Sequence, residues 1–385
     1  MKKVIVTGYP YAYLYYFKVF EYASSKEDFV FILPKLWQAK AGKIKINLKP
    51  RKDFAVYGRR AASFGGRGWR GLFKGWLPGL IFLLPYLKLK YKSQILYSCS
   101  EPNLLTTLFN GLLAKLCGLK HILFTWQNVP PEQRMRGIKL KLSNVLVRWN
   151  LRLAAGIICG NRKAEQIINQ LQTTNYKLPT MVCPLSGVDV EKFKPADQSK
   201  TAKNKVILFY GALEKRKGVE FLVQAFSRLS VPGVELLIIG AGPQKEKLKK
   251  MTEDLGLKEK TTFKDWMKNE ELPEVLRNSA VFVYPSVPSG GWEEQFGYAM
   301  AEASASEVPV VATKTGSIEE VIKNGETGIL VDSGQVEQLK EALEKLLIDG
   351  GLRERMGLAG RDFVVKNFSH RVVASKINNF LNQFI

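Results

Sequence analysis

The chain has 385 residues, of which 46% are hydrophobic and 11% aromatic. This length suits two α/β domains, and the apolar content excludes a disordered chain. The formal net charge of +23 lies wholly in the first half, because residues 1–200 hold 33 Lys and Arg against 10 Asp and Glu, whereas residues 201–385 hold 25 of each. This asymmetry predicts two domains with different partners.

The first half alternates between strand and helix patterns. Its opening residues read as a strand followed by the turn Gly8-Tyr9-Pro10, and their apolar part is too short for a signal peptide. We therefore expect a cytoplasmic protein. Further strands are predicted at 94–98, 121–126 and 156–159, and helices at 104–116, 140–154 and 164–171. Such an order predicts a doubly wound parallel sheet.

The densest basic region runs from Lys40 to Lys92 and contains fourteen basic residues and one acid, Asp53. It encloses the apolar stretch 75–87, which is shorter than the ~20 residues of a spanning helix and is interrupted by prolines. That stretch is either a core helix or an interfacial segment.

Basic residues set among aromatic ones are attracted to an anionic bilayer surface. We therefore expect the first domain to contact such a membrane, with a solvated basic face as the alternative. Nucleic acid is not expected as a partner, since no recognition motif for it is present. The residues expected at the membrane are Trp69, Phe73, Trp76 and Phe82 among Arg67, Arg70, Lys74 and Lys88, within a region that also holds Lys43, Lys45, Arg51, Arg59, Arg60 and Lys90.

The second half repeats the alternation after a polar, aperiodic stretch at 189–204 that reads as a linker. Its predicted strands are 205–210, 234–239, 262–263, 281–284 and 308–312, and its predicted helices are 219–229, 244–255, 272–278 and 296–305. Four cysteines lie far apart without a Cys-x-x-Cys pair, which indicates neither a zinc site nor a disulfide framework and fits a reducing cytosol.

Two carboxylates, Glu294 and Glu302, flank a predicted helix start near Phe296. A helix N-terminus offers unpaired N–H groups and a partial positive charge to a diphosphate. Eight helical steps span roughly 12 Å, so a hydroxyl-binding carboxylate could lie on each side of that anion. A nucleotide sugar has this layout of hexose, diphosphate and ribose.

This motif and its neighbours resemble the signature of the family-four retaining glycosyltransferases of the GT-B fold. The first half resembles that family loosely, at 100–102 and 125–128. The segments that carry the resemblance are 186–195, 210–226, 239–243, 294–302, 308–313 and 325–331.

The resemblance implies an α/β fold of two Rossmann-like doubly wound domains facing a central cleft. An N-terminal acceptor-binding domain would span 1–188 and a C-terminal donor-binding domain 204–365, with a last helix at about 366–385 packing back onto the first. It also implies a metal-independent retaining hexosyltransferase without a cofactor, whose co-substrate is a nucleotide-diphosphate sugar. The acceptor would be lipid-linked or a saccharide. The basic first half adds the expectation that the protein is peripheral to the inner face of the cell membrane.

Site roles follow from the same resemblance. Arg216 and Lys217 would place positive charge on the donor diphosphate, and Glu294 would contact hydroxyls of the donor sugar. The family usually has an arginine where this chain has Ala212, so Arg216 would supply that charge from another position. The implied donor-binding residues are Gly211, Gln295, Phe296, Gly297, Glu302, Trp266 and Met267, with Glu302 on the ribose and Trp266 and Met267 near the base.

One position departs from the family pattern. Family members commonly carry a histidine where this chain has Gln127, and a glutamine cannot act as a general base. The donor phosphate could instead take the acceptor proton, leaving Gln127 to hydrogen-bond the sugar. Asp189 and Glu191 do not form the Asp-x-Asp pair of a metal-dependent transferase, so no essential metal is expected.

Two other functions fit parts of the pattern. Another GT-B enzyme, such as a sugar-nucleotide epimerase or a phosphorylase, would use the same cleft. A non-catalytic protein that binds nucleotide sugar or membrane is the second alternative, and intact Glu294, Glu302 and Lys217 argue against it.

Overall fold

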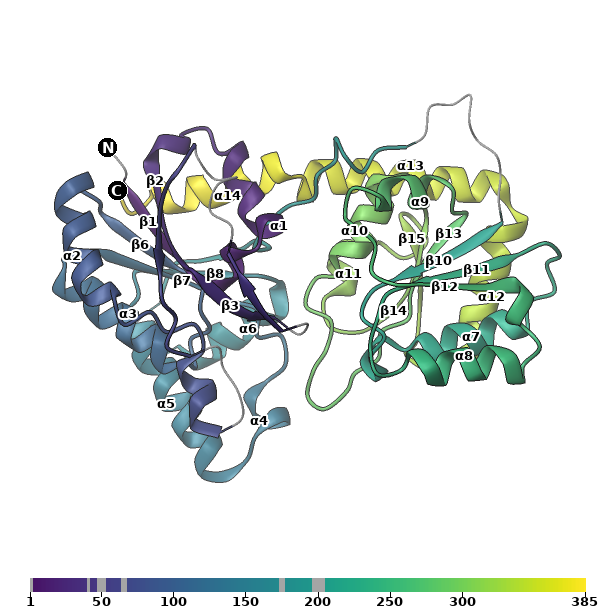
Figure 1. Cartoon of the computed structure of the whole chain (residues 1–385), viewed down its shortest axis with the longest axis horizontal. Coiled ribbons are helices and arrows are strands. Elements are labelled where there is room, and N and C mark those ends of the chain that lie inside the picture. Colours follow the sequence, from purple (N-terminus) through teal and green to yellow (C-terminus); the bar gives the residue numbers. More distant parts are fainter. Residues whose placement is uncertain (1–2, 40–41, 47–52, 64–67, 173–176, 196–204) are drawn as a thin grey trace. The chain divides into compact units, whose positions relative to one another are not determined.

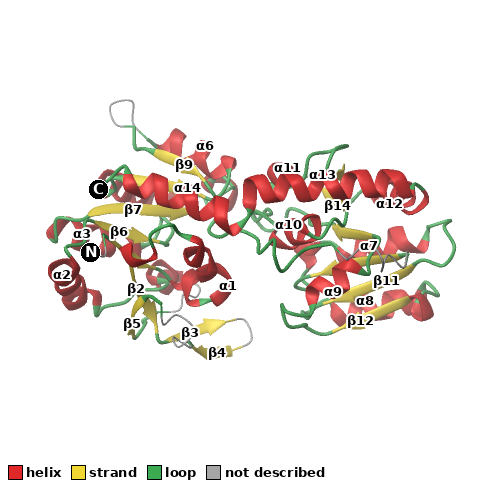
Figure 2. Ribbon diagram, turned by 90° about the horizontal axis from the view of Figure 1, so that it is seen from above, coloured by secondary structure: helices red, strands yellow, loops and turns green. Residues whose placement is uncertain are grey.

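The computed structural model describes residues 3–39, 42–46, 53–63, 68–172, 177–195 and 205–385. The chain divides into two compact units, which we call unit 1 (residues 1–187 and 370–385) and unit 2 (residues 188–369). In each unit, helices cover both faces of a parallel sheet, as Figure 1 and Figure 2 show. The predicted fold class of two Rossmann-like domains is thus confirmed.

The sheet of unit 1 has the strand order β5-β2-β1-β6-β7-β8-β9, and all of its pairings are parallel. Strands β1 and β2 are buried along their whole length, as expected of a sheet covered on both faces. A separate antiparallel pair joins β3 (Leu36–Ala39) to β4 (Gly42–Lys45). The strands of the main sheet are β1 (Val4–Thr7), β2 (Phe29–Pro34), β5 (Ala55–Arg59), β6 (Ile95–Ser98), β7 (Lys120–Thr125), β8 (Gly156–Cys159) and β9 (Thr180–Val182).

Helices on both sides complete unit 1. The C-terminal helix α14 contributes Val373, Ile377 and Phe380 to the core beneath the sheet. The helices are α1 (Leu14–Phe17), α2 (Leu80–Tyr91), α3 (Leu105–Leu116), α4 (Pro131–Arg134), α5 (Gly137–Leu153), α6 (Arg162–Leu171) and α14 (His370–Asn382), with 3₁₀ turns η1 (Tyr9–Ala12), η2 (Lys18–Tyr22), η3 (Lys26–Asp28) and η5 (Gly68–Phe73).

The apolar stretch at 75–87 forms most of α2, which continues through Pro85. One side of this helix is buried through Leu80, Leu84 and Leu87, whereas Phe82 remains 82% exposed. The stretch is therefore a core helix that also presents apolar surface. None of the described helices is long and apolar enough to cross a membrane.

Several residues predicted at the membrane pack inward instead. The ammonium of Lys74 lies 4.4 Å from the centre of the Tyr9 ring, and Lys88 donates a hydrogen bond of 2.7 Å to the Ser93 carbonyl. The half-buried ring of Trp76 packs against Phe109 at 5.7 Å. The predicted membrane-contacting surface therefore does not include Lys74, Lys88 or Trp76.

Trp69, Arg70 and Phe82 stay exposed. Arg51 and Arg67 lie outside the described residues, as does the side chain of Lys43.

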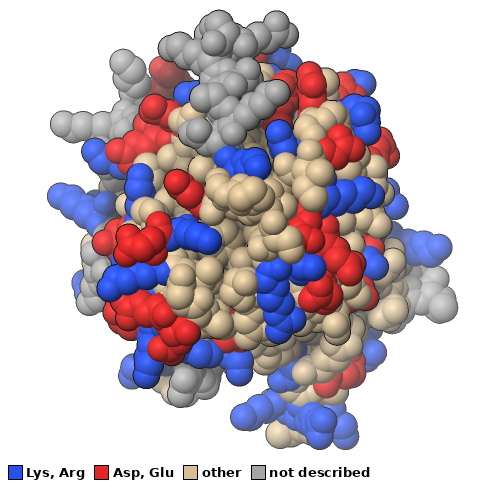
Figure 3. Space-filling model, turned by 90° about the vertical axis from the view of Figure 1, so that its right-hand side faces the viewer, with Lys and Arg blue, Asp and Glu red and all other residues tan. Residues whose placement is uncertain are grey.

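The sheet of unit 2 has the order β12-β11-β10-β13-β14-β15, again all parallel. Its face in Figure 3 carries Lys and Arg interspersed with Asp and Glu, in line with the balanced charge of the second half. The strands are β10 (Val206–Tyr210), β11 (Glu235–Ile239), β12 (Thr261–Lys264), β13 (Val281–Tyr284), β14 (Val310–Thr313) and β15 (Gly328–Val331). The helices are α7 (Val219–Ser227), α8 (Lys245–Asp254), α9 (Leu272–Arg277), α10 (Tyr298–Ala305), α11 (Ile318–Val321), α12 (Val336–Ile348) and α13 (Gly350–Phe368), with 3₁₀ turns η7 (Lys215–Lys217) and η8 (Lys258–Lys260).

The described part of the predicted linker, residues 189–195, belongs to unit 2. Phe193 is 1% exposed, and its carbonyl accepts a hydrogen bond of 3.1 Å from Arg361. This segment is held by packing that its polar composition did not indicate. Residues 196–204 lie outside the described part of the chain.

Candidate active site

The candidate site of unit 2 lies where the strand order of the sheet reverses. Strands β10 and β13 are neighbours there, and the chain leaves them in opposite directions along the sheet. Open α/β sheets bind ligands outside the carboxyl ends of their strands at such a switch point. Lys217 follows β10 and Glu294 follows β13, so the two loops bring predicted site residues to this place.

Lys217 and Glu294 form a buried ion pair. The distance from Lys217 Nζ to Glu294 Oε2 is 2.6 Å, and each residue is 7% exposed. The hydroxyl of Tyr284 accepts a hydrogen bond of 2.5 Å from Lys217 Nζ and donates one of 2.8 Å to Glu294 Oε2. Ser286 Oγ donates a longer bond of 3.3 Å to the same carboxylate oxygen. The three principal groups thus make a closed triangle.

Burial shapes the charges of this triangle. It lowers the pKa of Lys217, while the adjacent Glu294 carboxylate acts in the opposite direction. Burial also raises the pKa of Tyr284 well above its usual value, and the nearby carboxylate adds to this effect. Tyr284 is therefore a neutral hydroxyl that can donate to Glu294.

Arg216 lies beside this triangle but has other contacts. Its Nε is 2.6 Å from Glu214 Oε2, and its guanidinium carbon lies 4.0 Å from the centre of the Trp292 ring. The Lys217 ammonium is 5.3 Å from the same ring. Trp292 was not among the predicted residues, although its place after two glycines in the loop before Glu294 was a usable signal.

Two glycines let backbone segments approach closely around the pair. Gly218 has φ of 62°, and a Cβ atom there would lie 2.0 Å from the Pro285 carbonyl oxygen. Gly316 has φ of 59°, and a Cβ atom there would lie 1.9 Å from the Glu294 carbonyl oxygen. Both positions combine a left-handed conformation with a lack of space for a side chain.

The second predicted carboxylate, Glu302, lies in the middle of α10. It is 4% exposed, and its Oε2 accepts a hydrogen bond of 2.6 Å from the Tyr210 hydroxyl at the end of β10. Burial raises the pKa of Tyr210 well above its usual value, so this hydroxyl also stays neutral.

Helix α10 starts at Tyr298, two residues after the predicted start, with Gly297 at its N-cap. The buried Phe296 side chain packs against Phe368 at 5.1 Å. Only the backbone of Phe296 therefore remains for the predicted diphosphate contact.

The remaining predicted donor residues lie on loops of unit 2. Trp266 is 60% exposed and follows β12 with the half-buried Met267. Gly211 follows β10 and approaches Gly240, where a Cβ atom would lie 1.9 Å from the Gly211 carbonyl oxygen. Gln295 is half-buried in the loop before α10.

Two buried hydroxyls beside Glu294 were not predicted. Thr315 Oγ1 and Ser317 Oγ, on either side of Gly316, have no hydrogen-bond partner among the described residues. The Ser317 amide donates a bond of 2.9 Å to the Glu294 carbonyl. Among the described residues there is no cluster of three or more His, Cys, Asp or Glu suited to a metal ion.

Gln127 belongs to unit 1, where it is 9% exposed at the end of β7. Glu101, from the segment 100–102 to which the sequence assigned no role, stabilises this turn: its carboxylate accepts hydrogen bonds of 2.6 Å from Thr125 Oγ1 and 3.0 Å from the Trp126 backbone N–H. The backbone N–H of Gln127 in turn donates a hydrogen bond of 3.1 Å to Thr125 Oγ1. Burial raises the pKa of Glu101, whereas Thr125, Trp126, Arg134 and Lys74 oppose that shift.

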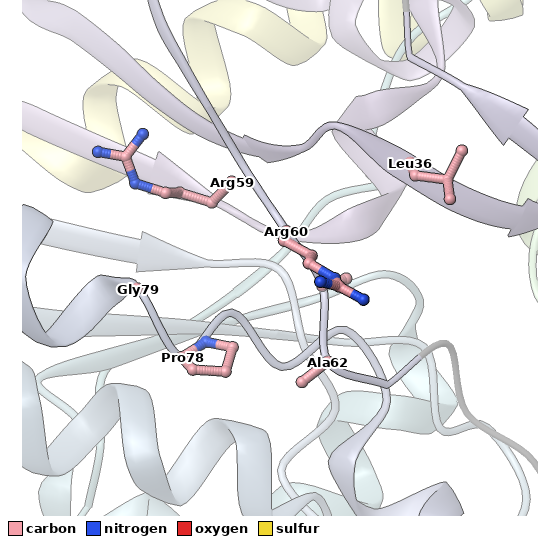
Figure 4. Close-up of a pocket in the computed structure, with 7 residues that line it drawn as sticks. Leu36, Arg59, Arg60, Ala62, Pro78 and Gly79 are labelled. Carbon is pink, nitrogen blue, oxygen red and sulfur yellow. The ribbon is translucent and has the colours of Figure 1, made fainter.

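A pocket of about 690 Å³ opens elsewhere in unit 1. Figure 4 shows Arg59 and Arg60 at the end of β5, with their guanidinium groups directed to different sides above Pro78 and Gly79. None of the predicted catalytic or donor-binding residues is among the residues that line this pocket.

Comparison with known proteins identifies the second unit. Residues 190–363 match the family described as glycosyl transferases group 1. Unit 2 is a glycosyl transferases group 1 domain. The predicted resemblance is therefore confirmed for unit 2.

Curated relatives agree with this group 1 assignment. Over 207 residues the chain is 33% identical to a GDP-mannose-dependent alpha-(1-6)-phosphatidylinositol monomannoside mannosyltransferase of Mycobacterium tuberculosis, covering 51% of this chain and 54% of that protein. It is 31% identical over 249 residues to the capsular polysaccharide biosynthesis glycosyltransferase CapM of Staphylococcus aureus, covering 58% and 60%. The chain thus spans about half the length of such relatives.

Two solved structures share the fold. The Anabaena protein Alr3699/HepE in complex with UDP has a TM-score of 0.76 at 16% identity, with full coverage of both chains. Sucrose-phosphate synthase from Thermosynechococcus elongatus also has a TM-score of 0.76, at 17% identity, covering 100% of this chain and 99% of that one. At such identities the likeness concerns the fold alone.

The role of Tyr284 in this group 1 domain can be tested by Tyr284→Phe. The change removes two hydrogen bonds to charged groups but leaves Lys217 and Glu294 paired. We expect a loss of about 1.5–3 kcal/mol in the free energy of unfolding and a reduced kcat/KM. Thermal unfolding and initial rates measure both, and a variant with unchanged values would show that the hydroxyl is dispensable.

Proposed function

We propose that the protein is a retaining glycosyltransferase that moves a hexose from a nucleotide-diphosphate sugar to a lipid-linked or saccharide acceptor. Its setting would be the biosynthesis of a glycolipid or cell-envelope glycan. The observation that carries the proposal is the buried pair of Lys217 and Glu294 at the switch point of a group 1 domain. Buried charges of this kind are costly to maintain, which favours a functional reason for keeping them.

In the proposed reaction the bond between the sugar C1 and the diphosphate oxygen breaks, and the nucleotide diphosphate leaves with the electron pair. The acceptor oxygen bonds to C1 on the same face, and its proton passes to an oxygen of the departing phosphate. An ammonium has three N–H donors. Two of the Lys217 N–H groups donate hydrogen bonds to Tyr284 and Glu294, so the third can stabilise the negative charge that develops on the diphosphate.

Neighbouring groups position the donor in this proposal. Glu294 binds hydroxyls of the hexose, Glu302 serves the ribose, and the backbone of Phe296 and Gly297 meets the diphosphate at the start of α10. Gln127 hydrogen-bonds the sugar and does not act as a base. Arg216, whose guanidinium group lies over the Trp292 ring, adds positive charge beside the diphosphate.

The relatives support the proposed classes of donor and acceptor. One relative's name states GDP-mannose as donor and a phosphatidylinositol mannoside as acceptor, and another's places it in capsular polysaccharide biosynthesis. A guanosine diphosphate sugar as donor and a lipid-linked or saccharide acceptor follow by analogy. The identity of the sugar depends on the loops around Lys217 and Glu294.

The proposed location is peripheral, on the cytoplasmic face of the cell membrane. It is supported by the net charge of the first half, by the exposed Trp69 with Arg70 over its ring, and by the exposed Phe82 on α2. Aromatic and basic side chains together favour the surface of an anionic bilayer. Lys74 is not included, because its ammonium packs on Tyr9.

Product analysis tests the proposed reaction. With a saccharide acceptor, we expect the anomeric configuration of the donor sugar to be preserved, as NMR of the product shows, and we expect activity to survive EDTA. An inverted product contradicts the retaining mechanism, and a loss of activity restored by a divalent cation contradicts metal independence. Release of free nucleotide without acceptor, with an isomerised sugar, would identify the epimerase instead.

A further inference from the structure

Helix α5 exposes an apolar stripe that the core of unit 1 does not use. Its core side is formed by Val147 and Leu151. Spacings of four, three and four residues place the stripe on one face of the helix. The residues of this stripe, which we call the α5 stripe, are Ile138 (68% exposed), Leu142 (62%), Val145 (44%) and Trp149 (54%).

The neighbouring helix α3 extends this apolar surface. Helix α3 packs beside α5, since a Cβ atom on Gly111 would lie 3.5 Å from Leu153 Cβ. Near that contact, α3 exposes Leu112 at 48% and Leu116 at 82%. Helix α2, with its exposed Phe82, packs on α3 in turn, and Figure 1 shows the three helices side by side.

Positive charge surrounds the α5 stripe. The sequence from residue 133 to 164 contains no acidic residue. A second copy of this chain is a poor occupant, because pairing the stripe with itself would bring like charges together. An anionic bilayer satisfies both properties, since its headgroups attract the bases and its interface accepts Trp and aliphatic side chains. The exposed bases on and just before α5 are Arg136, Lys139, Lys141, Arg148 and Arg152.

We propose that α5 lies in the headgroup region of an anionic membrane, with the α5 stripe inserted and its bases paired with lipid phosphates. This inference rests on the membrane-peripheral location in the proposed function, and it adds a second element to the contact at η5 and α2. Contact through helices on the same side of the sheet would hold unit 1 in one orientation on the bilayer. Binding of this kind combines buried apolar area with electrostatic attraction.

Vesicle sedimentation with phosphatidylglycerol and phosphatidylcholine tests the inference. We compare the whole protein with the double variant Leu142→Ser/Trp149→Ser and with Ile348→Ser/Leu358→Ser, a matched control on unit 2 where the exposures are 73% and 51%. A third variant, Trp69→Ser/Phe82→Ser, removes the contact at η5 and α2. We expect at least a tenfold loss of partitioning for the α5 variant and no loss for the control.

Fluorescence gives a readout that does not depend on a folding defect. Brominated lipid should quench wild-type emission, and Trp149→Phe should remove part of this quenching while retaining the same nucleotide-sugar binding. Unchanged partitioning of the α5 variant together with unchanged quenching in Trp149→Phe overturns the inference.

The two membrane elements can fail separately. Loss of binding in the variant at η5 and α2 alone leaves the peripheral location intact but removes α5 from the contact. Equal partitioning of the wild type onto neutral and anionic vesicles, or onto neither, contradicts the peripheral location itself. A dimer in light scattering that the α5 variant converts to monomer identifies a second copy as the occupant and also overturns the inference.

Discussion

We expect Lys217→Ala and Glu294→Ala each to lower kcat/KM by roughly 10²–10³-fold, the loss typical of removing one preorganised group that stabilises charge in a transition state. The Lys217→Ala variant lacks the ammonium of the triangle with Tyr284 and Glu294, so no cation from this triangle stabilises the leaving diphosphate. The Glu294→Ala variant lacks the carboxylate that is proposed to bind the sugar. Initial rates with saturating acceptor, at a fixed series of donor concentrations, measure the change.

Each single change also destabilises unit 2. Both partners are 7% exposed, and removing one leaves the other buried without its counter-charge, which typically costs about 3–5 kcal/mol. The double variant Lys217→Met/Glu294→Gln removes both charges and should recover part of the free energy of unfolding without recovering activity. Urea unfolding of the three variants separates the structural effect from the catalytic one.

A surface pair provides the control for these variants. Lys245 and Asp265 form an ion pair of 2.5 Å, but the Asp265 side chain is 81% exposed. Such pairs contribute about 0–1 kcal/mol, so Lys245→Met should change neither stability nor turnover appreciably. Wild-type turnover in Lys217→Ala or in Glu294→Ala, with a folded protein, would remove the substituted residue from the proposed chemistry.

The sequence predicted the central strands of both sheets because their signal is local, but it did not predict β2, β5, β9 or β15. Buried parallel strands such as β13 are short continuous apolar runs, and the glycines after them mark the turns. The same local signal placed Lys217 and Glu294 in loops after strands. It could not show that they pair with each other, since 77 residues separate them and their contact depends on the sheet order.

The sequence pattern did not predict features that depend on tertiary packing. Lys74 reads as one more base in a basic region, and its place on the Tyr9 ring follows from the tertiary fold. Residues 189–195 are polar enough to read as a linker, yet Phe193 is buried in unit 2. The α5 stripe has the spacing of a core helix, and only the structure shows that this face is exposed.

The second prediction with a large effect concerns Gly316→Ala. Its φ of 59° lies in the left-handed region, where an alanine costs about 1–2 kcal/mol. The added Cβ atom would also lie 1.9 Å from the Glu294 carbonyl oxygen and 2.6 Å from the Glu294 amide nitrogen. Because these are backbone atoms, the clash cannot be relieved by rotating a side chain. The Glu294 segment must therefore move.

Such a displacement acts on the carboxylate proposed to bind the sugar. A misplacement of about 1 Å can cost roughly 10²-fold in rate even when no catalytic group is removed. We therefore expect Gly316→Ala to lower kcat/KM by about that factor, with the free energy of unfolding reduced by more than the conformational cost alone. Initial rates and urea unfolding measure the two effects.

Gly325→Ala is the matched control, because it shares the conformation but not the crowding. Gly325 has φ of 79°, and a Cβ atom there would meet nothing within 4 Å. This variant should lose about 1–2 kcal/mol of stability and retain its activity. The difference in activity between the two variants then isolates the approach of Gly316 to Glu294. Equal activities would mean that the position of the Glu294 backbone does not limit the reaction.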